Sequence, residues 1–212
     1  MYTVDLVHST PDGDNLVSYM ARVSNPDNQN NTETSARLIK YLIIHKHWSP
    51  FEMVNMCVQI STTRSTAAQI LRHRSFSFQE FSQRYAQVTE PIGTPELRRQ
   101  DPVNRQNSID DLDSFTLQHF QVRLQHHIRQ SIYIYQSMLE AGVAKECARE
   151  VLPLCTPTKL YMNGTLRSWL HYCELRTANG TQLEHKLIAE RCKDLVVEQF
   201  PLVAEAMEWT SS

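Results

Sequence analysis

Residues 51–61 alternate apolar and polar side chains, and this period of two limits the possible folds more than any other pattern in the chain. The apolar positions are Val54, Met56, Val58 and Ile60. An extended strand with this pattern has one strongly apolar face, which must pack against another layer. We expect a helix to cover that face. A second alternating segment, residues 2–8, predicts another strand.

Helical periodicity dominates the rest of the sequence. The predicted helices cover residues 10–23, 33–47, 64–74, 112–140, 144–152, 159–176 and 182–200. Gly142 ends the longest of them, and Pro153 and Pro201 end two others. Residues 90–111 contain three prolines and predict an excursion over the surface. Few strands lie close together in sequence, which favours an α+β fold over a doubly wound parallel sheet.

Composition excludes several classes of protein. The 212 residues are 41% hydrophobic and 21% charged, which fits one globular domain over residues 1–212. A formal net charge of −2 gives no general attraction to nucleic acid or to an anionic membrane. No apolar run could span a bilayer, and the N-terminus does not resemble a signal peptide. The five cysteines include no C-x-x-C, so we expect reduced, mostly buried thiols in a cytoplasmic protein without a metal site.

Positive charge is concentrated in residues 69–85. Arg72, His73, Arg74 and Arg84 lie there with Glu80 as the single acid. Neighbours on a helix point about 100° apart, so we expect part of the triplet to face inward or across a subunit contact. A buried arginine needs an anionic partner. The planar fork of arginine suits phosphate. An ion-pair network between subunits, or a solvated face, explains the composition equally well. No G-x-G-x-x-G or P-loop motif offers another way to hold phosphate.

The spacing Arg72-His73-Arg74, seven residues, Ser82 resembles the signature of the flavin-dependent thymidylate synthases. Residues 47–52 (HWSPFE), 148–153 (AREVLP), 166–168 (LRS), Arg176 and residues 182–184 (QLE) extend the resemblance over nearly the entire chain. It implies a central, mainly antiparallel sheet and a homotetramer with sites shared between subunits. It also implies an enzyme that converts dUMP to dTMP with methylenetetrahydrofolate as carbon donor, FAD as redox carrier and NADPH as reductant.

The resemblance further implies roles for individual residues. The implied cofactor contacts are Ser49, Arg72, His73, Arg74, Glu80, Arg167 and His171. The implied dUMP contacts are Gln69, Arg72, Glu80, Ser82, Gln83, Arg84, Arg149 and Arg176, with Arg149 reached from another subunit. Thr165, His171 and Gly180 stand where some members carry Asn or His.

The candidate catalytic residues are Arg176, Ser82 and His47. Arg176 is expected against the uracil ring, where a fixed cation stabilises developing negative charge. No Ser-His-Asp spacing supports a nucleophilic Ser82, so we favour a hydrogen-bonding anchor for the nucleotide. His47 corresponds to a position beside the flavin and folate.

Two other classes of function stay open from the residues alone. A nucleic-acid-binding module would use the basic residues of segment 69–85 together with Arg98 and Arg99. Phe76, Phe78 and Phe81 would serve as stacking platforms for bases. The net charge and the absence of a binding motif argue against it. A metal-dependent phosphohydrolase would need His45, His47, His126 or His127, but no H-E-x-x-H motif is present. Bound oxidised FAD would make the purified protein yellow, which neither alternative predicts.

Overall fold

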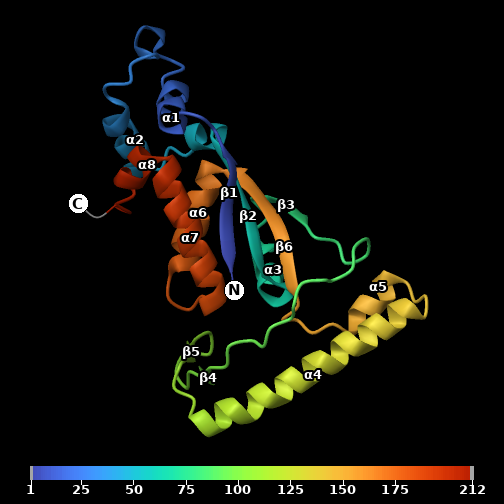
Figure 1. Ribbon diagram of the computed structural model, residues 1–212. Helices are drawn as coiled ribbons and strands as arrows, with labels where there is room; N and C mark the ends of the chain where they lie inside the picture. The colour runs from blue at the N-terminus through green and yellow to red at the C-terminus, as the bar shows by residue number, and fades with distance from the viewer. Residues whose placement is uncertain (1, 211–212) are drawn as a thin grey trace.

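A four-stranded antiparallel sheet forms the centre of the computed structural model, which describes residues 2–210 (Figure 1). In sheet order the strands are β1 (Thr3–Ser9), β2 (Asn55–Thr63), β6 (Pro157–Thr165) and β3 (Ser77–Glu80). Every neighbouring pair is antiparallel. The predicted α+β fold with a mainly antiparallel sheet is therefore confirmed.

Strand β2 carries the apolar face that the alternation predicted. Met56, Val58 and Ile60 have no exposed surface. The strand begins at Asn55, so the predicted start at residue 51 is wrong by four residues. The preceding residues form a 3-10 helix, η2 (Ser49–Met53), which Pro50 favours because its fixed φ suits a first helical turn.

The prediction of one helix over residues 159–176 is also wrong. Its first half is the strand β6, and helix α6 begins only at Leu166. Leu160, Met162 and Gly164 are the inward-facing, buried positions of β6, between β2 and β3. Only two of these positions carry large apolar side chains, and a helical pattern follows directly, so the period of two is hard to recognise in the sequence.

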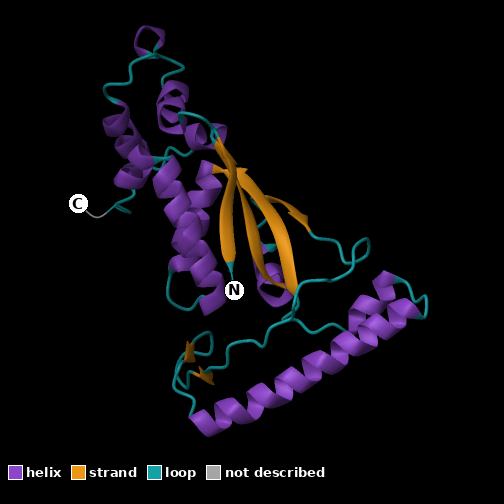
Figure 2. Cartoon of the chain, viewed as in Figure 1, coloured by secondary structure: helices purple, strands orange, loops and turns teal. Residues whose placement is uncertain are grey.

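Helices cover the sheet and flank it (Figure 2). Their bounds are α1 (Gly13–Ala21), α2 (Ser35–Ile44), α3 (Arg64–Ile70), α4 (Ser114–Glu140), α5 (Lys145–Ala148), α6 (Leu166–Thr177), α7 (Leu183–Gln199) and α8 (Pro201–Ala206), with short 3-10 helices η1 (Pro26–Asn28) and η3 (Arg149–Val151). The buried Trp169 of α6 donates its indole N–H to the Met56 carbonyl over 2.9 Å. This bond ties α6 to β2, so the expected helical cover is confirmed. Pro201 both follows α7 and opens α8.

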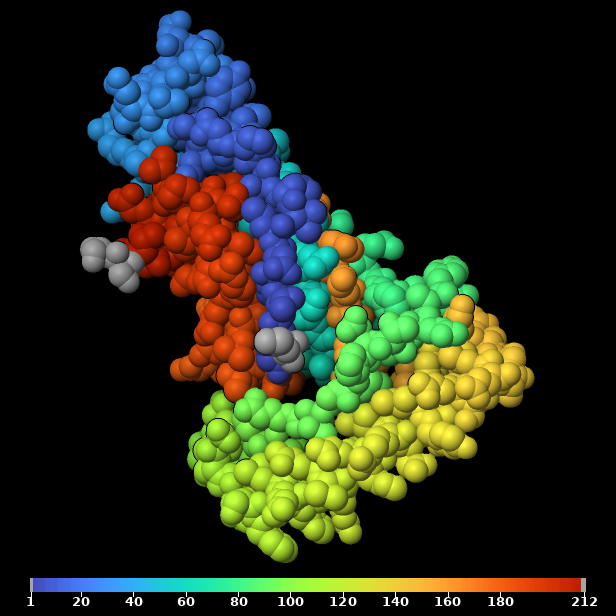
Figure 3. Space-filling model, in the orientation of Figure 1, coloured from blue at the N-terminus to red at the C-terminus, as the bar shows by residue number. Residues whose placement is uncertain are grey.

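Helix α4 extends away from the sheet as an arm (Figures 1 and 3). The Asp113 carboxylate accepts the Thr116 backbone N–H at 2.9 Å, and Gly142 beyond the C-terminus has φ +84°. Phe115 and Tyr133 on this helix are 78% and 66% exposed. The segment predicted as an irregular excursion contains a small hairpin of β4 (Arg99–Gln100) and β5 (Ser108–Ile109).

Two further expectations concern cysteines and membranes. All five cysteines are free, and Cys57, Cys173 and Cys192 are buried, as predicted. Among the described residues, no helix combines the length and the apolar character needed to cross a membrane.

Candidate active site

The basic triplet lies in the turn after α3 and not on the helix. α3 ends at Ile70, and the backbone N–H of His73 donates to the Ile70 carbonyl at 3.1 Å. Arg72 and Arg74 are exposed, whereas His73 is half-buried. Of the triplet, His73 is therefore the member that faces inward, and a subunit contact for Arg72 or Arg74 stays a prediction. Within residues 2–210 neither arginine forms an ion pair, so both guanidinium groups are available to an anionic ligand.

His73 and Arg176 form the central contact of the site. The Arg176 Nε–H donates to His73 Nε2 over 2.8 Å, which requires a neutral imidazole with its proton on Nδ1. The His73 ring packs edge-on against Tyr172, with 4.9 Å between the ring centroids. Burial, followed by the charges of Arg176 and His171, lowers the pKa of His73 to about 4. The imidazole is therefore neutral near pH 7 and orients the guanidinium group of Arg176.

A second histidine, His185, lies behind His73 and has no exposed surface. His185 Nε2 is 3.2 Å from the Tyr172 hydroxyl, and the two histidine rings are 6.0 Å apart. Burial lowers the pKa of His185 to about 3. Sequence analysis did not single out His185, because only the packing of α7 beside α6 brings it to this site.

Gln69 connects the end of α3 to the start of α7. Its side-chain amide donates to Gln182 Oε1, and the Gln182 amide donates to Glu184 Oε2 over 2.7 Å. Glu184 in turn pairs with Arg98. Gln69, a predicted dUMP contact, is thus held in place by Gln182, just before α7, and indirectly by Glu184 in its first turn.

A small cavity of about 280 Å³ brings Gln83 and Arg149 together with Arg64. Gln83 is buried, and its amide Nε2 has no hydrogen-bond partner among the described residues. Arg64 donates to Glu80 Oε1 at 2.6 Å, and Thr158 donates to the same oxygen at 3.0 Å. The structure places Arg149 beside Gln83 in the same chain, and the expectation that Arg149 reaches the dUMP site from another subunit stays a prediction.

Arg64 lines this cavity, and sequence analysis did not single it out. It is the first residue of α3. A cation at a helix N-terminus is electrostatically unfavourable unless an anion lies nearby, because the helix macrodipole is positive there. That mismatch is the signal that could have identified Arg64.

Ser82 and Arg84 flank Gln83, which lines the cavity of Arg64 and Arg149. Ser82 is half-buried, and its carbonyl accepts the backbone N–H groups of Tyr85 and Ala86 at 3.1 Å each. The exposed Arg84 pairs with Glu146 of α5 at 3.2 Å. Arg149 also reaches Glu146, donating to its carbonyl over 3.3 Å. Arg84 and Arg149 therefore converge on one residue of α5.

Two of the predicted flavin residues line a different cavity, of about 440 Å³. Arg167 and His171 line it with Ser75, the apolar side chains of Trp48 and Leu170, and the carboxylates of Glu52 and Glu174. Arg167 also pairs with Glu52. This mixture of a planar apolar wall, a cation and hydrogen-bonding groups fits a polar heterocycle such as a flavin.

His47 and Ser49 do not line that cavity, although Trp48 between them does. His47 is exposed and packs its ring edge-on against Tyr41, with the centroids 6.0 Å apart. Ser49 is exposed at the start of η2. The structure therefore places both residues near the candidate flavin cavity but outside its walls.

Comparison with known proteins identifies the family of this chain. The family model described as "Thymidylate synthase complementing protein" matches residues 5–202. A probable flavin-dependent thymidylate synthase of Paramecium bursaria Chlorella virus 1 is 49% identical over 207 residues, which covers 98% of this chain and 96% of the relative. The chain belongs to the flavin-dependent thymidylate synthase family. It is accordingly a flavin-dependent enzyme of thymidylate synthesis, as the sequence resemblance implied.

A second flavin-dependent thymidylate synthase and one solved structure are also similar to this chain. The enzyme of a Synechocystis species is 48% identical over 200 residues, covering 94% of this chain and 91% of the relative. The crystal structure of the UMP/dUMP methylase PolB from Streptomyces cacaoi, bound with 5-Br dUMP, has a TM-score of 0.86 at 29% identity. That comparison covers 99% of this chain and 95% of the methylase. The fold of a nucleotide methylase is therefore shared over almost the whole chain.

Proposed function

We propose that this flavin-dependent thymidylate synthase converts dUMP to dTMP with FAD as redox cofactor, methylenetetrahydrofolate as carbon donor and NADPH as reductant. The observation that carries the proposal is the cavity of Arg64, Gln83 and Arg149. It holds an unpartnered amide donor beside two guanidinium groups, of which Arg149 has only an exposed carboxylate as its ion-pair partner. A nucleotide phosphomonoester carries nearly two negative charges and accepts several hydrogen bonds, so it suits this donor set. A relative of similar fold has been solved with 5-Br dUMP, which supports the same class of substrate.

Arg176 acts on the base of the nucleotide in this proposal. Its charge stabilises the negative charge that develops on the uracil ring as carbon 5 becomes nucleophilic. The neutral His73 orients the guanidinium group through the bond to Nε. Ser82 anchors the nucleotide through its hydroxyl. When bound, the flavin supplies the electrons that reduce the transferred one-carbon unit to a methyl group.

Flavin binding in this proposal uses the cavity lined by Arg167 and His171 together with the exposed arginines of the basic turn. Ser75, the neighbour of Arg74, lines the same cavity, and its carbonyl accepts a hydrogen bond from Ser168 Oγ at 3.3 Å. The turn and the cavity are therefore adjacent. FAD carries a pyrophosphate, for which unpaired guanidinium groups are suitable partners.

The enzyme assembles as a homotetramer in this proposal, because the contacts for one nucleotide fall into two separate groups. Within residues 2–210, no hydrogen bond or ion pair joins the Arg149 cavity to the Arg176–His73 pair. A neighbouring copy would place its own group beside the first. The exposed apolar side chains of α4, among them Phe115 and Tyr133, support association. The free thiols support a reducing, cytoplasmic setting.

Leaving out one reactant at a time tests the proposal. Purified protein with oxidised FAD should be yellow, and dTMP should form only when dUMP, methylenetetrahydrofolate and NADPH are all present, as measured by chromatography. Formation of dTMP without added folate would refute the proposed carbon donor. Light scattering that gives a stable monomer would refute the tetramer.

A further inference from the structure

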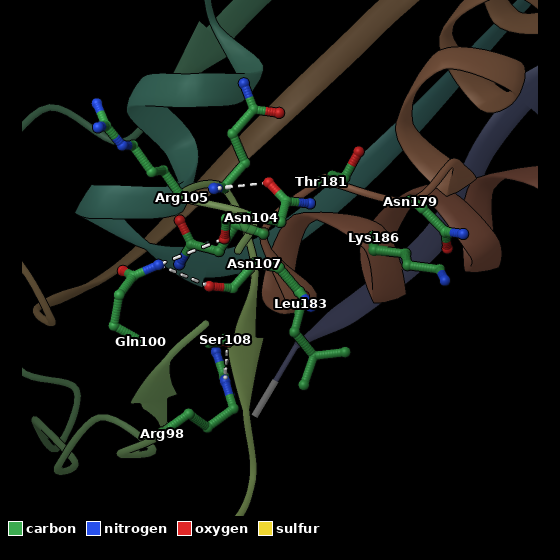
Figure 4. A pocket seen from close by; sticks show the side chains of 13 residues that line it. Arg98, Gln100, Asn104, Arg105, Asn107, Ser108, Asn179, Thr181, Leu183 and Lys186 are labelled. Atoms are coloured by element: carbon green, nitrogen blue, oxygen red, sulfur yellow. Dashed lines mark hydrogen bonds between the residues drawn. The ribbon is translucent and has the colours of Figure 1, made fainter. Parts of the chain in front are cut away.

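A cavity of about 700 Å³ opens between the β4–β5 hairpin and the loop that leads into α7, and none of the predicted site residues lines it (Figure 4). One wall carries Arg98, Asn104, Arg105 and Gln106. The opposite wall carries Asn179 and Lys186. The loop of the second wall follows directly after α6, the helix that carries Arg176. The cavity therefore lies next to the candidate active site.

Its lining is cationic in a chain that is slightly acidic. The lining includes three cations, Arg98, Arg105 and Lys186, and no carboxylate. Arg98 is neutralised by Glu184 and Glu96. Within residues 2–210 Arg105 has no ion pair, and Lys186 has only a 3.9 Å contact with Glu190. Two positive charges thus remain for a ligand, which must be anionic.

The hairpin wall is held in shape by its own hydrogen bonds. The Asp101 carboxylate accepts the backbone N–H groups of Val103 at 2.8 Å and Asn104 at 3.0 Å. Arg98 attaches the hairpin to α7 through Glu184, with side chains only 9% and 12% exposed. These contacts fix the position of the backbone at Arg105, so part of the ordering cost of binding is met in advance.

The lining also limits the kind of anion. No aromatic side chain is part of it, and Leu183 is its one apolar member. A nucleotide would need a surface against which its base could stack, so adenine is disfavoured. Separated cations and several side-chain amides suit a flexible chain that carries carboxylates at intervals.

We propose that this cavity binds the glutamyl carboxylates in the tail of the folate co-substrate, an inference that rests on the proposed function. Gln182 lines the cavity and also accepts a hydrogen bond from Gln69, a predicted dUMP contact. A folate whose ring reacts beside the nucleotide can therefore extend its tail past Gln182 into the cavity. Arg105 and Lys186 bind successive carboxylates there.

The KM of methylenetetrahydrofolate with one and with five γ-linked glutamates tests this proposal. The pentaglutamyl form should have a KM about 25- to 100-fold lower in the parent enzyme, because two cations each contribute about five- to tenfold. Arg105→Gln and Lys186→Gln should each raise the pentaglutamyl KM about five- to tenfold and the monoglutamyl KM by less than twofold. Lys40→Gln, which removes an exposed lysine of α2, is the matched control and should change neither value.

Direct binding separates this inference from the proposed function. Penta-γ-glutamate alone should bind to the FAD- and dUMP-loaded parent in a calorimeter and should not bind to the Arg105→Gln/Lys186→Gln double variant. If dTMP forms but the peptide does not bind and the parent shows no preference for pentaglutamyl folate, this inference fails while the proposed function stands. A raised KM for NADPH, or a loss of flavin, in the variants would instead assign the cavity to a nucleotide and overturn the inference.

Discussion

Replacing Arg176 with Lys should slow flavin oxidation while preserving the charge at this position. In the structure the Arg176 Nε–H donates to His73 Nε2 at 2.8 Å, which leaves the terminal nitrogens free to bond the nucleotide. The single ammonium of lysine has no planar fork that could serve both partners in fixed directions. The variant therefore loses either its orientation by His73 or its contact with the uracil ring.

The size of the effect follows from that missing bond. A hydrogen bond to a charged group contributes about 1.5–3 kcal/mol. If the bond acts only in the transition state, the loss slows the chemical step about 10- to 150-fold, since about 1.4 kcal/mol corresponds to a factor of ten. Removal of a single preorganised donor from other active sites costs about a hundredfold or more, which agrees with the upper part of this range.

A single-turnover experiment measures the step directly. The enzyme is reduced anaerobically with NADPH, mixed with dUMP and methylenetetrahydrofolate, and followed by flavin absorbance. Reduction by NADPH should survive in Arg176→Lys, because that step needs no charge on the uracil. Arg191→Lys, an exposed arginine of α7 that pairs with Glu198, is the matched control.

A double-mutant cycle with His73→Ala then tests the orienting role of His73. If His73 acts through Arg176, the two substitutions should be strongly non-additive in the oxidation rate. Near-parental oxidation by Arg176→Lys, with full flavin content, would refute the assignment of Arg176 to the developing charge. Additive effects would refute the orienting role of His73.

Three other substitutions test Ser82 as the anchor of the nucleotide, the close packing of Gly164 against Phe76, and the buried His185. Ser82→Ala should raise the KM for dUMP and leave measurable dTMP formation, whereas complete loss of turnover with normal dUMP binding would indicate a nucleophile. Gly164→Ala should lower the free energy of unfolding by about 1–3 kcal/mol in urea titrations, because the new Cβ would lie 2.6 Å from Phe76 Cε1. Burial lowers the pKa of His185 to about 3, so between pH 6.5 and 3 the unfolded chain binds a proton that the folded chain does not. Neutral His185 therefore contributes fully to stability above pH 6.5. Below pH 6.5 its contribution to the free energy of unfolding falls by about 1.4 kcal/mol per pH unit. His185→Phe should flatten that slope, and an unchanged slope would contradict the assignment.

Long, regular patterns made part of the fold predictable. Helix α4 was predicted within two residues at its start, because apolar positions recur over its whole length and Gly142 takes a positive φ that ends it. The face of β2 was predictable for a similar reason, since four alternating positions leave no helical interpretation. Strand β6 was missed because only Leu160 and Met162 among its buried positions carry large apolar side chains, and helix α6 follows without a break.

The site itself was predictable only where a motif names the residues. His73 and Arg176 were both candidates, but nothing in the spacing of two residues 103 positions apart indicates that they share a hydrogen bond. The ring of His185 reaches this pair through α7, which the sequence placed correctly but could not orient. Packing between helices, and not local pattern, decides these contacts.

Arg64 shows how charge can reveal a site that a motif does not include. A cation in the first turn of α3 opposes the helix macrodipole, and its pair with Glu80 neutralises only one of the two arginines around the Gln83 cavity. Arg149 has Glu150 as its ion-pair partner at 3.4 Å, but that carboxylate is 72% exposed and strongly solvated. The exposed Arg149–Glu150 pair is therefore the one that an anionic ligand can displace, and Gln83 adds an unpartnered donor at the buried wall of the cavity. A dianionic phosphate can replace Glu150 on Arg149 and accept the hydrogen bond of Gln83 at once, whereas a neutral ligand cannot compete with the carboxylate for Arg149.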